Sequence, residues 1–318
     1  MSGKIAFLFP GQGAQYVGMG QELAARYPSA RKVFDQAGEA LGFDLAGLCF
    51  TGPNGLLEAT SVTQPAVLTV SVAALEVLRE HGLRPHVAAG LSLGEYTALV
   101  AAGSLDFSRA VRLVRERGRL MEEAVPGGQG AMAAIIGLHR DQVVEICRRA
   151  AGDQVLEPAN FNSPDQVVIS GHRPAVERAV SLATGMGARR AVMLPVSGPF
   201  HSRLLEPAGR RLAEILEEVE IREAAIPVVA NVNASPVASP EEIRSALVRQ
   251  VSSPVLWEDS VRRMIADGVE CFVEVGPGRI LTGFVKRISR EAVAINVEDP
   301  PSLQKVLDQL PGGLLRCC

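Results

Sequence analysis

Hydrophobic residues along this chain gather in short, uninterrupted runs. Five runs are almost wholly apolar: IAFLF (5–9), VAAG (87–90), IPVVANV (226–232), CFVEV (271–275) and AVAINV (292–297). A strand covered on one face alternates apolar and polar residues, whereas a strand covered on both faces is apolar throughout. The runs therefore predict strands of a mainly parallel sheet that helices cover on both sides.

Segments with a helical period separate these strands. They lie at about 65–80, 108–123 and 203–219. A further helix begins at SPEE, where Ser239 is placed to cap, Pro240 fits the first turn and Glu242 completes a capping box. Strands that alternate with helices predict an α/β core.

The middle third of the chain has a different order of elements. After the glycine-rich stretch PGGQG (126–130), the pattern predicts strand, helix, strand, strand, helix and strand. This β-α-β-β-α-β order is that of the ferredoxin-like split unit. We therefore expect an inserted ferredoxin-like small subdomain at 127–197, and a large subdomain made of 1–126 and 198–318.

Length and composition limit the function classes. The chain has 318 residues, of which 47% are hydrophobic and 21% charged, and this suits one large domain or a domain with an insertion. A net charge of −3, scattered basic residues and 4% aromatic content predict no nucleic-acid-binding surface. No apolar run predicts a membrane span, and KIAFLFPGQG predicts a first strand rather than an export signal.

The cysteines indicate neither a metal site nor a disulfide framework. There are five, with no CxxC pair: Cys49, Cys147, Cys271, Cys317 and Cys318. An odd number without a regular spacing is typical of free thiols in a reducing compartment, so we expect a cytoplasmic protein. We expect the last two cysteines to lie in a frayed tail.

A serine between two glycines is the first candidate for chemistry. In GLSLG, Gly90 and Gly94 flank Ser92 after a predicted strand and before the apolar segment EYTALVAA. This strand–serine–helix layout is that of a nucleophile elbow, and free N–H groups at a helix N-terminus favour an oxyanion. The alternative is that Ser92 only caps the helix. The short motif favours the nucleophile without excluding the cap.

A serine hydroxyl becomes nucleophilic when a base, usually a histidine, accepts its proton. His201, in PVSGPFHS, follows a predicted strand and precedes a helix, so it belongs to the same edge of the sheet as Ser92. No acidic residue stands out as a third member, so we expect a backbone carbonyl or an amide to hold the imidazole. The other histidines lie at predicted element ends, where we expect structural roles: His81, His86, His139 and His172.

Two polar residues interrupt apolar helix faces. Arg117 falls in the apolar stripe of the helix at 108–123, and Gln250 continues the stripe of the helix that begins at SPEE. A buried charge needs a partner, so Arg117 forms either a structural salt bridge or a clamp for a substrate carboxylate, which its planar guanidinium suits. Gln250 either orients His201, directly or through its backbone carbonyl, or is satisfied by a neighbouring loop.

Glycines near the N-terminus allow the backbone to approach a ligand. The stretch FPGQGAQYVGMG (9–20) has neither the dinucleotide-binding nor the phosphate-loop spacing. It does follow the first predicted strand, as GLSLG follows the second. The backbone N–H groups of Gln12 and Leu93 are therefore candidates for the two-donor oxyanion hole that acyl transfer requires.

An ordered set of motifs resembles one enzyme family over nearly the whole chain. The set comprises FPGQGAQ, TQPA, GLSLGEY, RERGRLM, ANFNSP, QVVISG, PVSGPFHS and VEVGPG. It is similar to that of the malonyl-CoA:acyl carrier protein transacylases, which load malonyl units for fatty-acid synthesis. The resemblance implies an α/β-hydrolase-like core with a ferredoxin-like subdomain. It also implies malonyl transfer from malonyl-CoA to the phosphopantetheine thiol of acyl carrier protein, without a metal or redox cofactor.

The resemblance implies a role for each candidate residue. Ser92 is the nucleophile and His201 the base, Gln12 and Leu93 supply the oxyanion N–H groups, Arg117 grips the malonyl carboxylate, and Gln250 holds the histidine.

Two residues beside the candidates bear on the acyl pocket. Many relatives carry a histidine where Leu91 stands, and since that histidine is not the base, we expect a changed pocket polarity rather than lost activity. Phe200 resembles the malonyl-selective pattern, and its ring should crowd an α-methyl branch, so we expect malonyl to be preferred to methylmalonyl.

Three other functions share parts of the pattern. A serine esterase or thioesterase would share Ser92 and His201. A freestanding acyltransferase that serves a polyketide synthase would share every motif, and a catalytically silent acyl-binding module would lack one of the two residues.

Basic residues are candidates for docking the acidic acyl carrier protein. One cluster is Lys286, Arg287 and Arg290 near the end of the core, and another is the pair Arg189 and Arg190 in the insert. The alternative is that both are solvated helix faces.

Overall fold

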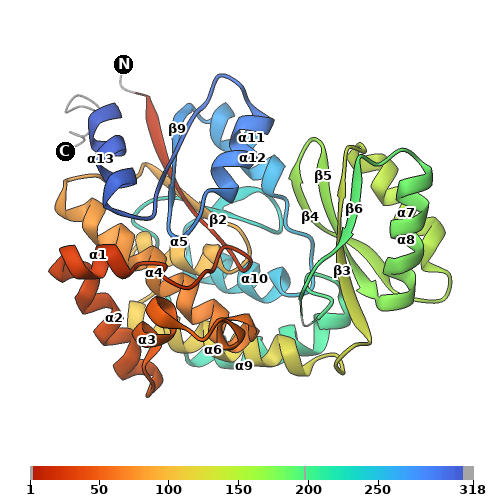
Figure 1. Ribbon diagram of the computed structural model, residues 1–318, viewed down its shortest axis with the longest axis horizontal. Coiled ribbons are helices and arrows are strands. Elements are labelled where there is room, and N and C mark those ends of the chain that lie inside the picture. Colours follow the sequence, from red (N-terminus) through yellow and green to blue (C-terminus); the bar gives the residue numbers. More distant parts are fainter. Residues whose placement is uncertain (1–2, 197, 311–318) are drawn as a thin grey trace.

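The computed structural model describes residues 3–196 and 198–310 and contains two β-sheets (Figure 1). Cys317 and Cys318, and the subdomain boundary expected at residue 197, lie outside the described residues. The larger sheet has the strand order β10-β9-β1-β2-β7-β8. Its strands are β1 (Lys4–Phe9), β2 (Val87–Gly90), β7 (Val228–Ala230), β8 (Ser235–Val237), β9 (Val269–Val275) and β10 (Val293–Val297).

The five strands predicted from the apolar runs are present and parallel. β8 was not predicted. It pairs antiparallel with β7 at the edge of the sheet and is only three residues long, with Pro236 at its centre. A short strand that contains proline has no apolar run to indicate it, and proline is tolerated there because an edge strand leaves one side unpaired.

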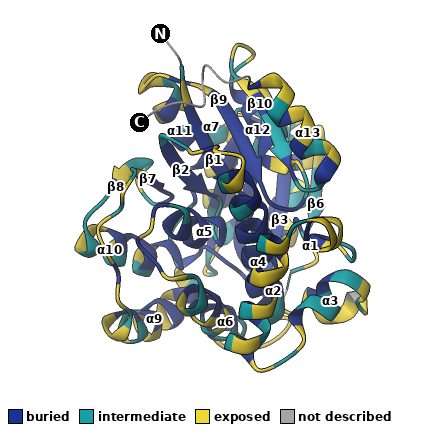
Figure 2. Ribbon diagram, turned by 90° about the vertical axis from the view of Figure 1, so that its left-hand side faces the viewer, coloured by how far each residue is buried: buried dark blue, intermediate teal, exposed yellow. Residues whose placement is uncertain are grey.

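Helices cover both faces of the larger sheet, as the continuous runs predicted. Ile5, Phe7 and Phe9 belong to one hydrophobic cluster, whereas Ala6 and Leu8, which alternate with them, belong to another. In Figure 2 the inner strands β1, β2, β7 and β9 are mostly buried, and the exposed positions lie mainly on the outer helices. The helices of this part are α1 (Gln21–Arg26), α2 (Pro28–Leu41), α3 (Leu45–Thr51), η1 (Asn54–Glu58), α4 (Thr60–Glu80), α5 (Gly94–Ala101), α6 (Phe107–Glu123), η2 (Arg203–Leu205), α9 (Glu206–Glu218), α10 (Pro240–Gln250), α11 (Trp257–Ala266), α12 (Ile280–Ile288) and α13 (Pro300–Gln309).

The predicted helices are present, but some of them begin or end at residues other than those expected. Ser239 and Glu242 form the predicted capping box of α10. The segment expected at 203–219 divides into η2 and α9. α4 starts five residues before the expected position, because Pro65 lies inside the helix rather than at its first turn.

The longer α4 corrects one expectation about membranes. This helix of 21 residues contains an 18-residue stretch with a mean hydropathy of 1.5, so by length and composition it could cross a membrane, contrary to what the sequence analysis concluded. However, 83% of the apolar window is buried inside the molecule, where α4 packs against α2 and α6. A core helix of this kind is apolar because protein surrounds it.

The second sheet is wholly antiparallel, with the order β4-β5-β3-β6. Its elements follow the predicted order: β3 (Gly130–Ile136), α7 (Arg140–Ala151), β4 (Leu156–Ser163), β5 (Gln166–His172), α8 (Arg173–Gly185) and β6 (Arg190–Met193). One face packs against α7 and α8. From the other face, Met132, Ala134 and Val168 join the cluster of the larger part, so the two sheets enclose the space between them.

Candidate active site

Ser92 lies in a sharp turn between β2 and α5. Its φ of 53° is in the left-handed region, which costs a non-glycine residue about 1–3 kcal/mol. The turn is so tight that a Cβ on Gly90 would come within 1.9 Å of Gly94, and a Cβ on Gly94 within 2.0 Å of the Phe9 carbonyl oxygen. The N-cap position of α5 is Leu93, without a side-chain cap. The structure therefore has the elbow, and Ser92 does not cap the helix.

The serine hydroxyl and the predicted histidine are in contact. Ser92 Oγ lies 2.7 Å from His201 Nε2. On the other side of the ring, His201 Nδ1 donates to the backbone carbonyl of Gln250 at 2.8 Å. This bond places the ring proton on Nδ1 and leaves Nε2 free to accept the serine proton. A backbone carbonyl thus occupies the position of the triad acid, one of the two arrangements expected.

The imidazole is held in its neutral form. His201 is 3% exposed, and burial together with the positive charge of Arg117 lowers the pKa of His201 from 6.5 to about 4. A histidine with this pKa is unprotonated at neutral pH, as a general base must be before the reaction.

Arg117 points inward from α6 to the same serine. The guanidinium donates from Nη2 to Ser92 Oγ at 3.1 Å and to Gln250 Oε1 at 2.9 Å, and from Nη1 to Gln64 Oε1 at 2.8 Å. These acceptors are all uncharged, and in the described part of the chain no carboxylate oxygen lies within 4.0 Å of Arg117. Arg117 therefore forms no salt bridge with a described residue. Burial lowers the pKa of Arg117.

These groups open into a cavity of about 560 Å³ between the two sheets. Gln12 and Leu93, the candidates for the oxyanion hole, are both in its lining, because β1 and β2 pair in parallel and end side by side, Phe9 opposite Gly90. Leu91 and Phe200 also line it. None of the other four histidines does. His86, His139 and His172 instead accept backbone N–H groups, in keeping with structural roles.

Sequence reasoning missed three buried polar residues of the site. Gln64 binds Arg117, Asn231 Oδ1 accepts the Ser92 N–H at 2.7 Å, and Glu95 accepts from Gln250 Nε2 at 2.8 Å. Their exposed fractions are 0–1%. Each interrupts or ends an apolar stretch, in TQPAVL, IPVVAN and GLSLGEY, and that is the pattern by which Arg117 and Gln250 were found.

The arrangement has features that acyl transfer uses: a hydroxyl in contact with a neutral base, a buried cation at the same hydroxyl, and a shared cavity whose lining includes Gln12 and Leu93. Within the described ranges there is no group of three or more His, Cys, Asp or Glu side chains that could hold a metal ion.

Comparison with known proteins identifies the family. Residues 6–306 match the family described as acyl transferase domain. Malonyl CoA-acyl carrier protein transacylases of Escherichia coli K12 and Bacillus subtilis are 49% and 46% identical to the chain, each over 96% of it and over 99% and 97% of the relative. The chain belongs to this acyl transferase family.

Solved structures of the family have the same fold. An acyl carrier protein S-malonyltransferase from Vibrio cholerae superposes on this acyl transferase with a TM-score of 0.93 at 48% identity, covering 95% of this chain and 99% of the other. A malonyl-transacylase solved in complex with its type II PKS acyl-carrier protein gives 0.94 at 46% identity, covering 96% and 99%. The mixed α/β architecture, with one mainly parallel and one antiparallel sheet, is thus that of the family.

Proposed function

We propose that this acyl transferase moves malonyl from malonyl-CoA to the phosphopantetheine thiol of acyl carrier protein, for fatty-acid synthesis, through a malonyl ester on Ser92. One observation carries the proposal: a single hydroxyl, Ser92 Oγ, is in hydrogen-bond contact with both a neutral imidazole and a buried guanidinium. The first contact suits acylation of the serine. The second suits an acyl group that carries a carboxylate. The names of the relatives support the same donor and acceptor.

The reaction then proceeds in two halves. The free carboxylate of malonyl-CoA binds Arg117, while Ser92 Oγ attacks the thioester carbonyl and its proton passes to His201 Nε2. The N–H groups of Gln12 and Leu93 hold the oxyanion. The C–S bond breaks, and His201 returns the proton to the leaving thiolate, which departs as coenzyme A. In the second half, the thiol of the carrier protein attacks the carbonyl of the malonyl ester, and His201 accepts the thiol proton. The C–O bond to Ser92 then breaks, and His201 returns the proton to Ser92 Oγ.

No metal or redox cofactor takes part in this scheme. A thioester becomes an ester and then a thioester again, so no atom changes oxidation state. The charge that develops is met by backbone N–H groups and by the imidazole.

The mass of the intact protein tests the function. After mixing with malonyl-CoA, we expect an increase of one malonyl group on Ser92, and holo acyl carrier protein should remove it. A Ser92→Ala protein should gain no mass. If the adduct instead disappears in buffer as fast as with the carrier protein, the enzyme is an esterase. An adduct that persists in Ser92→Ala would contradict the nucleophile.

Arg117→Ala tests the clamp. Without the guanidinium, malonyl transfer should fall by at least about 100-fold, because a charge-assisted bidentate pair to the substrate is lost, while transfer of uncharged acetyl should fall much less. Initial rates with malonyl-CoA and acetyl-CoA give the ratio. Equal losses for the two donors would exclude a carboxylate clamp.

We further propose that acyl carrier protein docks where the two basic clusters meet. Asp165 draws them together, since Arg189 Nη2 lies 2.9 Å and Arg287 Nη1 3.9 Å from its carboxylate oxygens. Arg287 also donates to Gln166, which lines the cavity. Arg287 on α12 and Arg189 just before β6 thus meet at Asp165, next to Gln166 of the cavity lining, where an acidic partner could deliver its thiol.

Charge reversal tests this surface. Arg287→Glu and Arg189→Glu should each raise the KM for the carrier protein several-fold at low salt without changing the rate of Ser92 acylation by malonyl-CoA. Arg148→Glu, at an exposed arginine of α7, is the matched control. An unchanged KM in both variants would exclude this surface.

A second candidate function is the transfer of malonyl to the carrier protein of a polyketide synthase. The relative that was solved with a type II PKS acyl-carrier protein resembles this chain about as closely as the Vibrio cholerae enzyme does. Transfer rates to a fatty-acid and a polyketide carrier protein, measured side by side, distinguish the two.

We also propose the subdomain division of the fold and the cellular compartment of the enzyme. The core is α/β-hydrolase-like, with 1–126 and 198–318 as the large subdomain. Residues 127–197 form the ferredoxin-like small subdomain, supported by the order β3-α7-β4-β5-α8-β6. We propose a cytoplasmic enzyme that acts on two soluble substrates, with no nucleic acid or membrane as partner.

The pocket lining supports preference for malonyl. Phe200, buried beside His201 in the cavity, is placed to crowd an α-methyl branch, and Leu91 gives the pocket an apolar wall next to the nucleophile.

A further inference from the structure

One buried acid in the site has no part in the proposed mechanism. Glu95 is in the first turn of α5 and is 1% exposed. A single carboxylate oxygen, Oε2, accepts two hydrogen bonds, one from Gln250 Nε2 at 2.8 Å and one from the Asn231 backbone N–H at 2.9 Å. A buried carboxylate is costly unless it is compensated, so its retention beneath the nucleophile calls for a reason.

The first hydrogen bond determines how Gln250 is oriented. Its amide nitrogen donates to Glu95 and to the Ser92 carbonyl at 3.0 Å, so its amide oxygen faces the other way and accepts from Arg117 Nη2 at 2.9 Å. The backbone carbonyl of the same residue holds His201. Glu95 therefore acts, through Gln250, on both the guanidinium and the imidazole.

The second hydrogen bond leads to the nucleophile. Asn231 Oδ1 accepts the Ser92 N–H at 2.7 Å, and its Nδ2 donates to the Gly90 carbonyl at 2.7 Å. These two bonds tie both sides of the elbow to the end of β7. Glu95 acts, through Asn231, on the strained backbone of Ser92.

Charge gives Glu95 a second effect. Arg117 has only uncharged hydrogen-bond partners in the described chain, and Glu95 is joined to it by the Gln250 amide. Burial raises the pKa of Glu95 to about 7, and it outweighs the hydrogen bonds from Gln250 and Asn231 and the positive charge of Arg117, which all lower that pKa. The other titratable groups packed here are Tyr96 on α5, with a pKa raised to about 12, and His201, with a pKa lowered to about 4.

We infer that Glu95 is the positioning residue of this site and the counter-charge of Arg117. Through Gln250 and Asn231 it keeps Arg117, His201 and Ser92 correctly placed relative to one another. Its negative charge weakens the attraction of Arg117 for a carboxylate. The inference deepens the proposed function and rests on it. When Glu95 is ionised, the substrate carboxylate meets a guanidinium whose charge is partly offset. When Glu95 is neutral, the attraction is stronger.

Two substitutions separate the charge from the hydrogen bonds. In Glu95→Gln, the amide oxygen can still accept from Gln250 and Asn231, so only the charge is lost. The KM for malonyl-CoA should then fall several-fold, with little change in the acylation rate by acetyl-CoA. In Glu95→Ala, two buried donors lose their acceptor, and acylation by both donors should slow by at least about tenfold.

Glu274→Gln is the matched control. Glu274 is 0% exposed and, like Glu95, accepts two hydrogen bonds, here from the backbone N–H groups of Leu281 and Thr282. It is not hydrogen-bonded to any residue of the Ser92, His201, Gln250 and Arg117 network. This variant should lose stability without a change in the ratio of malonyl to acetyl acylation. Equal changes in that ratio for Glu95→Gln and Glu274→Gln would overturn the inference.

A readout on the wild-type protein needs no variant and no turnover. The Tm increase caused by malonate should grow as pH falls from 8 to 6, because Glu95 takes up a proton in that range, and it should be independent of pH in Glu95→Gln. A pH-independent wild-type shift would contradict the counter-charge. Absence of any malonate shift, together with absence of a Ser92 adduct from malonyl-CoA, would instead contradict the proposed function.

Discussion

At the residue scale, the two reacting side chains are both on strained backbone. Ser92 and His201 have φ values of 53° and 58°, in the region that glycine normally occupies. Such strain persists only where the surroundings hold it, and here Asn231 binds the Ser92 backbone while the Gln250 carbonyl holds the His201 ring. The strain aims Oγ and Nε2 at each other across 109 residues of sequence.

The pKa of His201 predicts the pH dependence of acylation. Only the neutral imidazole accepts the serine proton, so activity should persist as pH falls through 6.5 and decline only towards the pKa of about 4. Acetyl-CoA is the suitable donor, since it carries no carboxylate to couple with Glu95. Initial rates of Ser92 acylation between pH 4 and 8, with circular dichroism to confirm folding, give the profile. An acid limb centred on 6.5 would show that the imidazole is not shielded.

At the element scale, the site depends on how close the start of α5 lies to the ends of β1 and β2. The elbow brings the first turn of the helix against both strand ends, with Gly94 beside the Phe9 carbonyl. No side chain fits between these segments. The sequence GLSLG predicts this packing, because glycine on both sides of the serine is what the close approach requires.

Gly94→Ala tests that packing. The added Cβ would lie 2.0 Å from the Phe9 carbonyl oxygen, and backbone cannot yield as a flexible side chain can. We expect a loss of more than about 3 kcal/mol in the free energy of unfolding, or failure to fold. Gly185→Ala, in the last turn of α8 with nothing within 4 Å of the new Cβ, should leave stability unchanged or slightly higher. Urea denaturation of both proteins gives the comparison.

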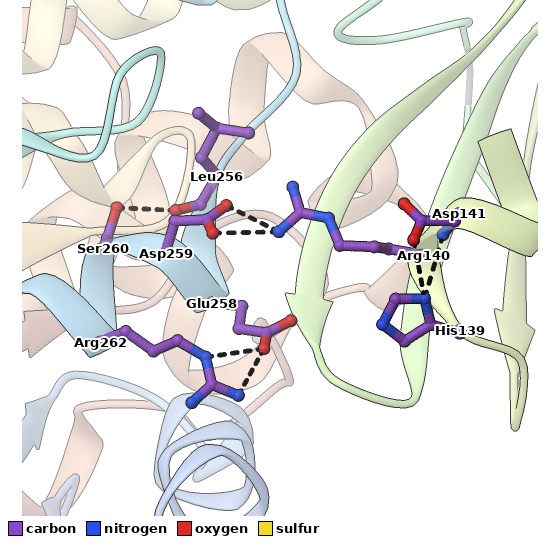
Figure 3. Close-up of polar contacts among 8 residues, drawn as sticks. All are labelled: His139, Arg140, Asp141, Leu256, Glu258, Asp259, Ser260 and Arg262. Atoms are coloured by element: carbon purple, nitrogen blue, oxygen red, sulfur yellow. Dashed lines mark hydrogen bonds and ion pairs between the residues drawn. The ribbon is translucent and has the colours of Figure 1, made fainter.

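At the scale of the whole molecule, the cavity exists because two sheets are held at a fixed distance. Val255, just before α11, exchanges backbone hydrogen bonds with β4 through Ala159 and Phe161. Nearby, Arg140 reaches from the start of α7 to Asp259 on α11 at 3.0 Å (Figure 3). Its guanidinium also lies 4.3 Å from the centre of the Phe161 ring. These contacts join the smaller sheet and its helix α7 to α11 and the segment just before it, which belong to the larger part.

Arg140→Ala should therefore weaken the junction. A partly exposed ion pair and a cation–π contact together contribute about 1–2 kcal/mol to the free energy of unfolding. Arg148→Ala, which removes an exposed pair within the same helix, should change it by less than about 0.5 kcal/mol. Thermal denaturation measures both. Equal effects would mean that the Arg140 contacts do not join the sheets.

The sequence by itself determined the parts of this protein that depend on local pattern. Continuous apolar runs specified the five parallel strands, because a strand buried on both faces has no polar side. The glycines around Ser92 specified the elbow, and Arg117 and Gln250 were recognised as inward-facing because they interrupt apolar stripes.

Only the tertiary structure decided which of these groups meet. It selected the backbone carbonyl of Gln250 as the partner of His201, joined Glu95 to the site through Gln250 and Asn231, and brought Arg189 and Arg287 to one aspartate. Such contacts link residues that lie far apart in the chain. They follow from how the helices and strands pack rather than from any single segment.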